Sequence, residues 1–204
     1  NFEPEAWSLR WYRQMVGIAS VGDTTVVSNK WMLGTRNSFI IGISATFLAT
    51  ALGTVAALGL SRRNMPFKGT IMAILISPMI VPLIITSAGM FFFYSKVGLT
   101  HTYLGLILAH TALGTPFVVI TVTATLTGFD TNLIRASQSL GANTMRTFFK
   151  VIMPLILPGV ISGALFAFIT SFDEVVVVMF VGSVEQITIP KQTWAGLRQE
   201  TSPV

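Results

Sequence analysis

Long uncharged apolar runs dominate this 204-residue chain and limit what it can fold into. Four runs, at 39–60, 71–94, 103–129 and 152–172, contain no Asp, Glu, Lys or Arg. A helix needs about 20 mostly apolar residues to cross a bilayer, so each run is long enough to do so. Charged residues make up only 10% of the chain, whereas about 25% is usual in a soluble domain. The chain is therefore predicted to be an all-α membrane protein.

The predicted organisation is a single transmembrane domain over residues 1–204. Four spans are expected, at about 39–60, 71–94, 103–128 and 159–181. Residues 1–38 are rich in aromatic side chains, which favour the membrane–water interface, so this segment is expected to lie along one surface; an ordinary extramembrane loop is the alternative. Pro78 and Pro82 should kink or interrupt the second span, because proline removes a helical hydrogen bond.

Composition also excludes several kinds of chemistry. The chain has no cysteine and two histidines, so disulfides, thiolate zinc sites and cysteine nucleophiles are excluded, and no metal site is expected. The phosphate-loop pattern G-x-x-x-x-G-K-[ST] is absent from the sequence, so we expect neither a catalytic residue nor a cofactor. The net charge of +5 comes from Lys and Arg scattered between apolar runs. That distribution favours a membrane protein over a nucleic-acid-binding protein.

The orientation in the membrane is predicted from short loops. The connection at 61–70 contains Arg62, Arg63 and Lys68 and no acidic residue. Positive charge in short loops close to the spans favours the cytoplasmic side. We therefore expect 61–70 and 130–150 in the cytoplasm, and the segment at 182–204 on the periplasmic side.

Two of the predicted spans carry small residues at every fourth position. One stripe is Ala45, Ala49, Gly53, Ala57 and Ser61, and the other is Gly159, Gly163, Ala167 and Ser171. A spacing of four places each set on one helix face. Small faces allow helix backbones to approach closely in lipid, so Ala49, Gly53, Gly163 and Ala167 are expected to pack inside a helix bundle.

The segment at 130–158 is too polar to cross the membrane and too regular for an ordinary loop. Leu133, either Ala136 or Ser137, and Leu140 follow helical spacing. Gly141 is a natural end for that helix, and Asn143 suits the N-cap of a second short helix. Pro154 and Pro158 are then expected to break the chain and redirect it into the last span. The prediction is a helix–turn–helix bracket at the membrane surface, with partly apolar faces that suit a partner protein.

This bracket resembles the EAA loop of ABC-importer permease subunits. In that family an E-A-A triplet is followed by a glycine and two prolines at set intervals. The spacing of the corresponding residues in this chain agrees with the pattern, although Arg135 replaces the glutamate and Ser137 the second alanine. The matching residues are Arg135, Ala136, Ser137, Gly141, Ala142, Pro154 and Pro158. The stretches 171–182, 187–194 and 8–12 are similar to the spermidine/putrescine permeases.

The resemblance implies the type I ABC importer fold, with four spans present of six. It also implies a bacterial inner-membrane protein that is not an enzyme. Its expected partners are a cytoplasmic ATPase dimer, a second homologous permease, a periplasmic substrate-binding protein and membrane lipid. The expected function is import of a small cationic solute by ATP-driven alternating access, with a polyamine as the first choice. Permeases for an opine, thiamine or ferric iron share much of the pattern. An ion-coupled secondary carrier is the alternative from another class.

Two adjacent acids in the last predicted span point to the substrate. A charge at the bilayer centre costs about 2.5–3.5 kcal/mol on insertion scales, so Asp173 and Glu174 are not expected to face lipid. One interpretation places both on a translocation route for cations, and the other makes them structural, capped by hydroxyl groups or paired with a partner subunit. His110 is interpreted as a hydrogen-bonded packing residue.

Overall fold

The computed structural model describes residues 30–62 and 64–199, and this part of the chain is helical without strands. Residues 1–29 of the predicted interfacial segment lie outside the described residues, and 30–38 belong to the first long helix instead. The all-α class is confirmed. In chain order the elements are α2 (Lys30–Leu60), α3 (Lys68–Ile80), α4 (Leu83–Val97), α5 (Tyr103–Thr127), α6 (Asn132–Ser139), α7 (Thr144–Thr147), the π-helical turn η1 (Phe148–Ile152), α8 (Met153–Asp173), α9 (Val176–Val181) and α10 (Ile189–Gln199).

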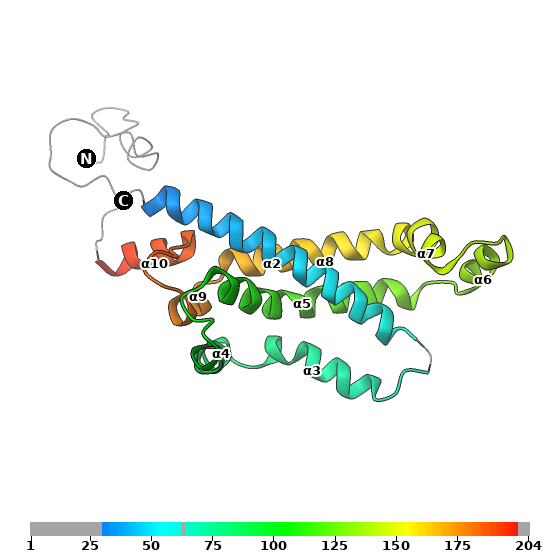
Figure 1. Cartoon of the computed structure of the whole chain (residues 1–204), viewed down its shortest axis with the longest axis horizontal. Coiled ribbons are helices and arrows are strands. Elements are labelled where there is room, and N and C mark those ends of the chain that lie inside the picture. Colours follow the sequence, from blue (N-terminus) through cyan, green and yellow to red (C-terminus); the bar gives the residue numbers. More distant parts are fainter. Residues whose placement is uncertain (1–29, 63, 200–204) are drawn as a thin grey trace, which may run out of the picture.

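Three long helices form the body of the molecule. In Figure 1, α2 and α5 run in the same direction and α8 returns between the same two ends. Helices α2 and α5, and the continuous helical stretch Thr144–Asp173, are each long and apolar enough to cross a membrane. The bracket elements α6 and α7 lie at one end, whereas α9 and α10 lie at the other. The connections 61–70 and 130–150 therefore share one end of the bundle.

The second apolar run is not one straight helix. Helix α3 ends at Ile80, α4 begins at Leu83, and their axes differ by 103°. Val81 is extended, with a ψ of 135°, because the ring of Pro82 disfavours helical backbone in the residue before it. The interruption expected from the two prolines thus occurs at Pro82, while Pro78 remains inside α3.

The last span also differs from the expected 159–181. Helix α8 ends at Asp173, and Glu174 has extended backbone angles of φ −74° and ψ 123° before α9 begins. One contact favours this break. The Glu174 side chain accepts a hydrogen bond from the Val177 N–H, near the start of α9.

At the other end of α8, Pro154 and Pro158 do not break the chain as expected. Helix α7, η1 and α8 follow one another without a gap, and Pro154 lies in the first turn of α8. A π-helical turn is wider than an α-helical turn and is a common way to accommodate local disruption within a helix. We attribute η1 to Pro154, whose ring would otherwise clash with the carbonyl group four residues earlier.

Small residues allow α2, α5 and α8 to pack closely. Val118 of α5 is fully buried between Gly53 of α2 and Gly163 of α8. A Cβ on Gly53 would lie 2.6 Å from the Val118 Cβ, and a Cβ on Gly163 would lie 2.8 Å from the Val118 Cα. Ala49 and Ala167 are both 1% exposed, and both lie against Gly114 of α5. The two stripes of small residues therefore pack against α5 of the same chain. Ser61, at the end of the first stripe, is exposed.

A leucine at Gly163 should destabilise this packing. The first carbon of the side chain would already lie 2.5 Å from the Thr121 Oγ1. We expect Gly163→Leu to lower the free energy of unfolding by about 3 kcal/mol, the upper end of the usual cost of overpacking. Thermal unfolding of the detergent-solubilised protein measures the loss. Gly89→Leu is the matched control, because a Cβ on Gly89 has nothing within 4 Å. Equal stability of the two variants would contradict the packing described here.

The end of the bundle opposite the bracket is closed by a network centred on Asn37. This side chain is fully buried, and its Nδ2 donates to the carbonyl groups of Glu185 at 3.1 Å and Ile187 at 2.9 Å. The Tyr103 hydroxyl donates to the Asn37 Oδ1 at 2.8 Å. Asn37 thus ties the connection between α9 and α10 to α2 and α5.

Neighbouring contacts extend the same network. Gln186 donates to the His101 carbonyl at 3.1 Å, and the Ser38 hydroxyl accepts the Ile189 N–H at 2.9 Å. The Lys191 ammonium donates to the Ser183 carbonyl at 2.9 Å, and its burial lowers the pKa of Lys191 below the ordinary value. The segment that follows α9 is therefore held firmly against the bundle.

Removing the Asn37 amide should loosen this end. We expect Asn37→Leu to lower the free energy of unfolding by about 3 kcal/mol, because a buried polar group left without its partner costs roughly 1–3 kcal/mol. Tyr103→Phe removes only one of the three hydrogen bonds, so its loss should be about 1 kcal/mol. Hydrogen exchange at residues 182–190 measures the local opening. Unchanged exchange in Asn37→Leu would mean that other contacts hold the segment.

Candidate functional site

The first arm of the bracket ends as its sequence predicts. Helix α6 is followed by Leu140 and then by Gly141, whose φ is 82°. The Gly141 N–H donates to the Gln138 carbonyl at 2.9 Å, and the Ala142 N–H donates to the Ser137 carbonyl at 3.1 Å. These bonds satisfy carbonyl groups at the end of α6, and the left-handed conformation suits a residue without a Cβ. The predicted role of Gly141 as the end of the helix is confirmed.

The second arm begins at Asn143, which is the expected N-cap. Its backbone is extended, and its Oδ1 accepts the Arg146 N–H at 2.8 Å. This contact satisfies one of the free amide groups at the start of α7. Four residues, 140–143, thus connect α6 to α7.

A hydrogen bond between side chains holds the two arms together. The Ser137 Oγ lies 3.0 Å from the Thr147 Oγ1, and Thr147 is buried. Ser137 is the position at which this chain departs from the second alanine of the EAA triplet. Sequence analysis did not identify Thr147, and nothing in its local pattern marks it, since the contact joins residues on two separate helices. Arg135 and Ala136, the first two residues of the triplet, are exposed.

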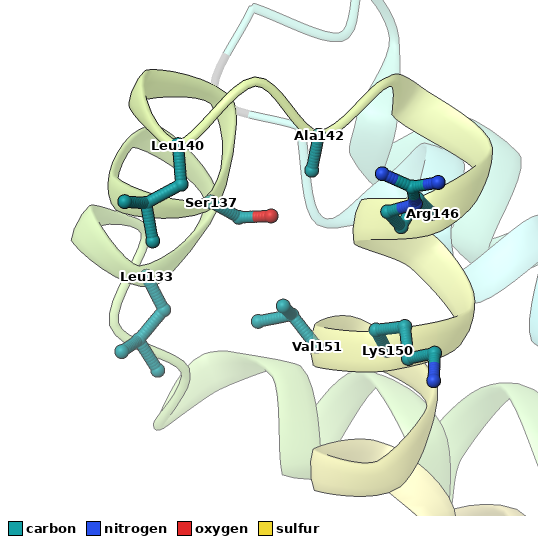
Figure 2. Close-up of a pocket in the computed structure, with 7 residues that line it drawn as sticks. All are labelled: Leu133, Ser137, Leu140, Ala142, Arg146, Lys150 and Val151. Atoms are coloured by element: carbon teal, nitrogen blue, oxygen red, sulfur yellow. The ribbon is translucent and has the colours of Figure 1, made fainter.

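A cleft of about 660 Å³ lies between the arms. Figure 2 shows Ser137, Ala142 and Val151 directed into it, with α6 on one side and the helix that leads into α8 on the other. The cleft combines aliphatic side chains with two cations, and its lining residues are Leu133, Ser137, Leu140, Ala142, Arg146, Lys150 and Val151. Of the predicted coupling residues, Ser137 and Ala142 line the cleft, whereas Pro154 and Pro158 lie further along the chain in α8.

The two acids at the end of α8 occupy different environments. Asp173 is the last residue of the helix and its side chain is exposed. Glu174 is 7% exposed, and its Oε1 accepts the Val177 N–H at 2.9 Å. The sequence interpretation placed both acids within one continuous span, pointing about 100° apart, but the helix ends at Asp173. The Asp173 side chain is thus exposed, whereas the Glu174 carboxylate is engaged by the backbone at the start of α9.

His110 of α5 contacts α8 near this break. Its Nδ1 lies 2.8 Å from the Ser171 Oγ, and the ring is buried. The interpretation of His110 as a hydrogen-bonded packing residue is confirmed. Among residues 30–62 and 64–199, no three His, Cys, Asp or Glu side chains are placed to hold a metal ion.

Sequence comparisons with known proteins identify relatives of this chain. The chain is 32% identical to the spermidine/putrescine transport system permease protein PotC of Haemophilus influenzae over 82% of the chain and 65% of that protein. It is 28% identical to the putrescine transport system permease protein PotI of Escherichia coli K12 over 97% of the chain and 69% of that protein. PotC of the same Escherichia coli strain is 26% identical over 100% of the chain and 76% of its own length.

The chain thus spans less than two thirds of the Haemophilus relative. One protein family matches a stretch of the chain that includes most of the helices described above. Residues 49–202 match the binding-protein-dependent transport system inner membrane components, from the middle of α2 through the bracket and α8 to the end of the described helices. The chain therefore belongs to this family of inner membrane permease components.

Proposed function

We propose that this protein is the membrane-spanning permease subunit of a bacterial ABC importer for polyamines. The observation that carries the proposal is the bracket. Helices α6 and α7 form a short, largely exposed unit that follows α5 and continues without a gap into α8. A push or pull on this unit is therefore transmitted along a helix that spans the membrane. A self-contained carrier has no need for such a lever.

The polyamine as substrate is supported by Asp173 and by the relatives. An exposed carboxylate at the break between α8 and α9 would favour a cationic solute over a neutral or anionic one. The helix end adds to this preference, because carbonyl groups at a C-terminus carry partial negative charge. The relatives named above are spermidine/putrescine and putrescine permeases.

The remaining partners follow from the type of importer. The chain would work with a cytoplasmic ATPase dimer, a second homologous permease and a periplasmic substrate-binding protein. Helices α3 and α4 would contact a partner protein or lipid, because they expose large apolar side chains. Among these are Ile74, Ile80, Ile84, Phe92 and Phe93. With the bracket in the cytoplasm, the Asn37 network and α10 would face the periplasm.

Purification of the protein expressed from its own gene tests the proposal. We expect an ATPase, a second permease and a binding protein to be isolated with it from mildly solubilised membranes. Calorimetry of that binding protein against spermidine, putrescine, an opine, thiamine and ferric iron then identifies the substrate. The absence of an ATPase, together with transport that depends on a proton or sodium gradient, would support an ion-coupled carrier. Binding of an opine, thiamine or iron alone would correct the substrate and leave the ABC permease in place.

A further inference from the structure

The exposed charge of the bracket is predominantly positive. Arg135 of α6, Arg146 of α7 and Lys150 of η1 all have exposed side chains. Asp130 is the single acidic residue of the segment 130–158, and its Oδ1 accepts the Asn132 N–H at 2.9 Å. With three exposed cations against one exposed carboxylate, the surface has a net positive charge, which attracts an acidic partner and repels a basic one.

The hydrogen bond between the arms determines where Arg135 points. Ser137 faces α7, because its hydroxyl contacts Thr147. Leu133 and Leu140 are four and three residues from Ser137, so they lie on nearly the same face of α6 and line the cleft with it. Arg135 is two residues away, which is about 200° around the helix. The guanidinium group therefore projects from the outer face of α6, away from the cleft.

The position of α6 favours a soluble protein over a lipid headgroup as the partner of this side. Figure 1 places α6 at the far end of the molecule, beyond the ends of α2, α5 and α8. None of its residues is buried, and it packs against α7 and η1. Lipid phosphates would meet Lys150 first, since η1 leads directly into the membrane-spanning α8. Arg135 is the charged group best placed for contact with a protein in the cytoplasm.

We infer that the ATPase partner presents a carboxylate to Arg135, and that this contact selects the ATPase that the permease accepts. The inference rests on the proposed function, because it specifies the chemistry of the ATPase surface at the same bracket. Arginine suits this task, since its planar guanidinium group forms two parallel hydrogen bonds with one carboxylate. Apolar side chains next to the cations, notably Leu140 at 88% exposure and Met145 at 66%, would add contact area.

Charge reversal at Arg135 tests the inference. The permease complex is purified through a tag on the permease, and the ATPase that remains bound is measured as the NaCl concentration rises. We expect Arg135→Glu to lower the retained ATPase about tenfold at low salt, because a like-charge contact at an interface is strongly unfavourable. Arg135→Lys should retain the ATPase at low salt and release it at a lower NaCl concentration than the unaltered protein.

A control and a reciprocal variant sharpen this experiment. Arg62→Glu changes the same charge at an exposed position on the same end of the bundle, and it should retain the ATPase fully. The ATPase carboxylate that crosslinks to position 135, changed to lysine, should restore binding to Arg135→Glu. Full retention by Arg135→Glu, with no dependence on salt, would overturn the inference. Loss of binding to phosphatidylglycerol vesicles alone would also overturn it, in favour of lipid. If the unaltered protein retains no ATPase, the proposed function itself fails.

Discussion

Gly141→Val is expected to separate ATP hydrolysis from transport. Gly141 has a φ of 82°, which a β-branched residue adopts only with strain. The left-handed conformation costs a residue with a Cβ about 1–2 kcal/mol. The turn should therefore rearrange and move α6 relative to α7. Because about 1.4 kcal/mol corresponds to a tenfold change, we expect coupled uptake to fall about tenfold or more. Uptake and ATPase activity of the reconstituted complex are the two measurements.

Gly128→Val is the matched control for this variant. Gly128 also lies at a helix end next to the bracket, but its φ is −88° and a Cβ there would have only the Thr125 carbonyl at 4.0 Å. A valine should fit at this position, and coupling should remain. The variant at Gly141 is expected to insert in the membrane normally, because the turn lies outside the spans. Normal uptake per ATP in Gly141→Val would show that the shape of this turn is not needed for coupling.

The second large effect is expected at Asp173. Asp173→Asn keeps the size and polarity of the side chain and removes its charge. Two unit charges at about 4 Å interact with about 1 kcal/mol in water and about 4 kcal/mol near a protein surface. We expect polyamine uptake to fall about tenfold or more, with assembly and basal ATPase activity unchanged. Uptake of labelled spermidine into proteoliposomes, measured over a range of concentrations, tests this expectation.

Glu174 should respond differently, because its carboxylate is engaged by the Val177 N–H. In Glu174→Gln the amide oxygen can still accept this hydrogen bond, so uptake should decrease less than in Asp173→Asn. Glu174→Leu removes the acceptor and should lower the melting temperature of the protein. If Glu174→Gln reduces uptake as much as Asp173→Asn, both acids contact the solute. If neither variant changes uptake, the cation route does not pass this break.

Features set by local sequence could be predicted without the structure. Gly141 and Asn143 act through their own backbone and its nearest neighbours, so residue type and spacing were sufficient to place the end of α6 and the start of α7. The small residues at every fourth position also indicated close packing, because that spacing places them on one helix face. The sequence predicted that Gly163 lies on the packing side of its helix. It did not predict that Gly163 packs against Val118 of the same chain.

Features set by tertiary contacts could not be predicted. Helix α8 ends next to Glu174, whose carboxylate accepts the Val177 N–H. The apolar residues on both sides of Glu174 predict a continuous span, and only the structure shows this contact. The contact of Ser137 with Thr147 and the network around Asn37 join residues distant in the chain, and no periodic pattern marks them. The prolines gave the position of a disruption but not its form. Pro82 produces a sharp bend, whereas Pro154 follows a π-helical turn within a continuous helix.

ATP-driven uptake by the reconstituted complex tests the central claim most directly. The protein expressed from its own gene, its partner permease and its ATPase are placed in proteoliposomes, with the ATPase inside and the binding protein loaded with labelled spermidine outside. We predict accumulation of label with ATP inside, no accumulation with ADP, and no effect of a protonophore. Accumulation that proceeds without ATP and collapses when the ion gradient is removed would contradict the account and identify a secondary carrier.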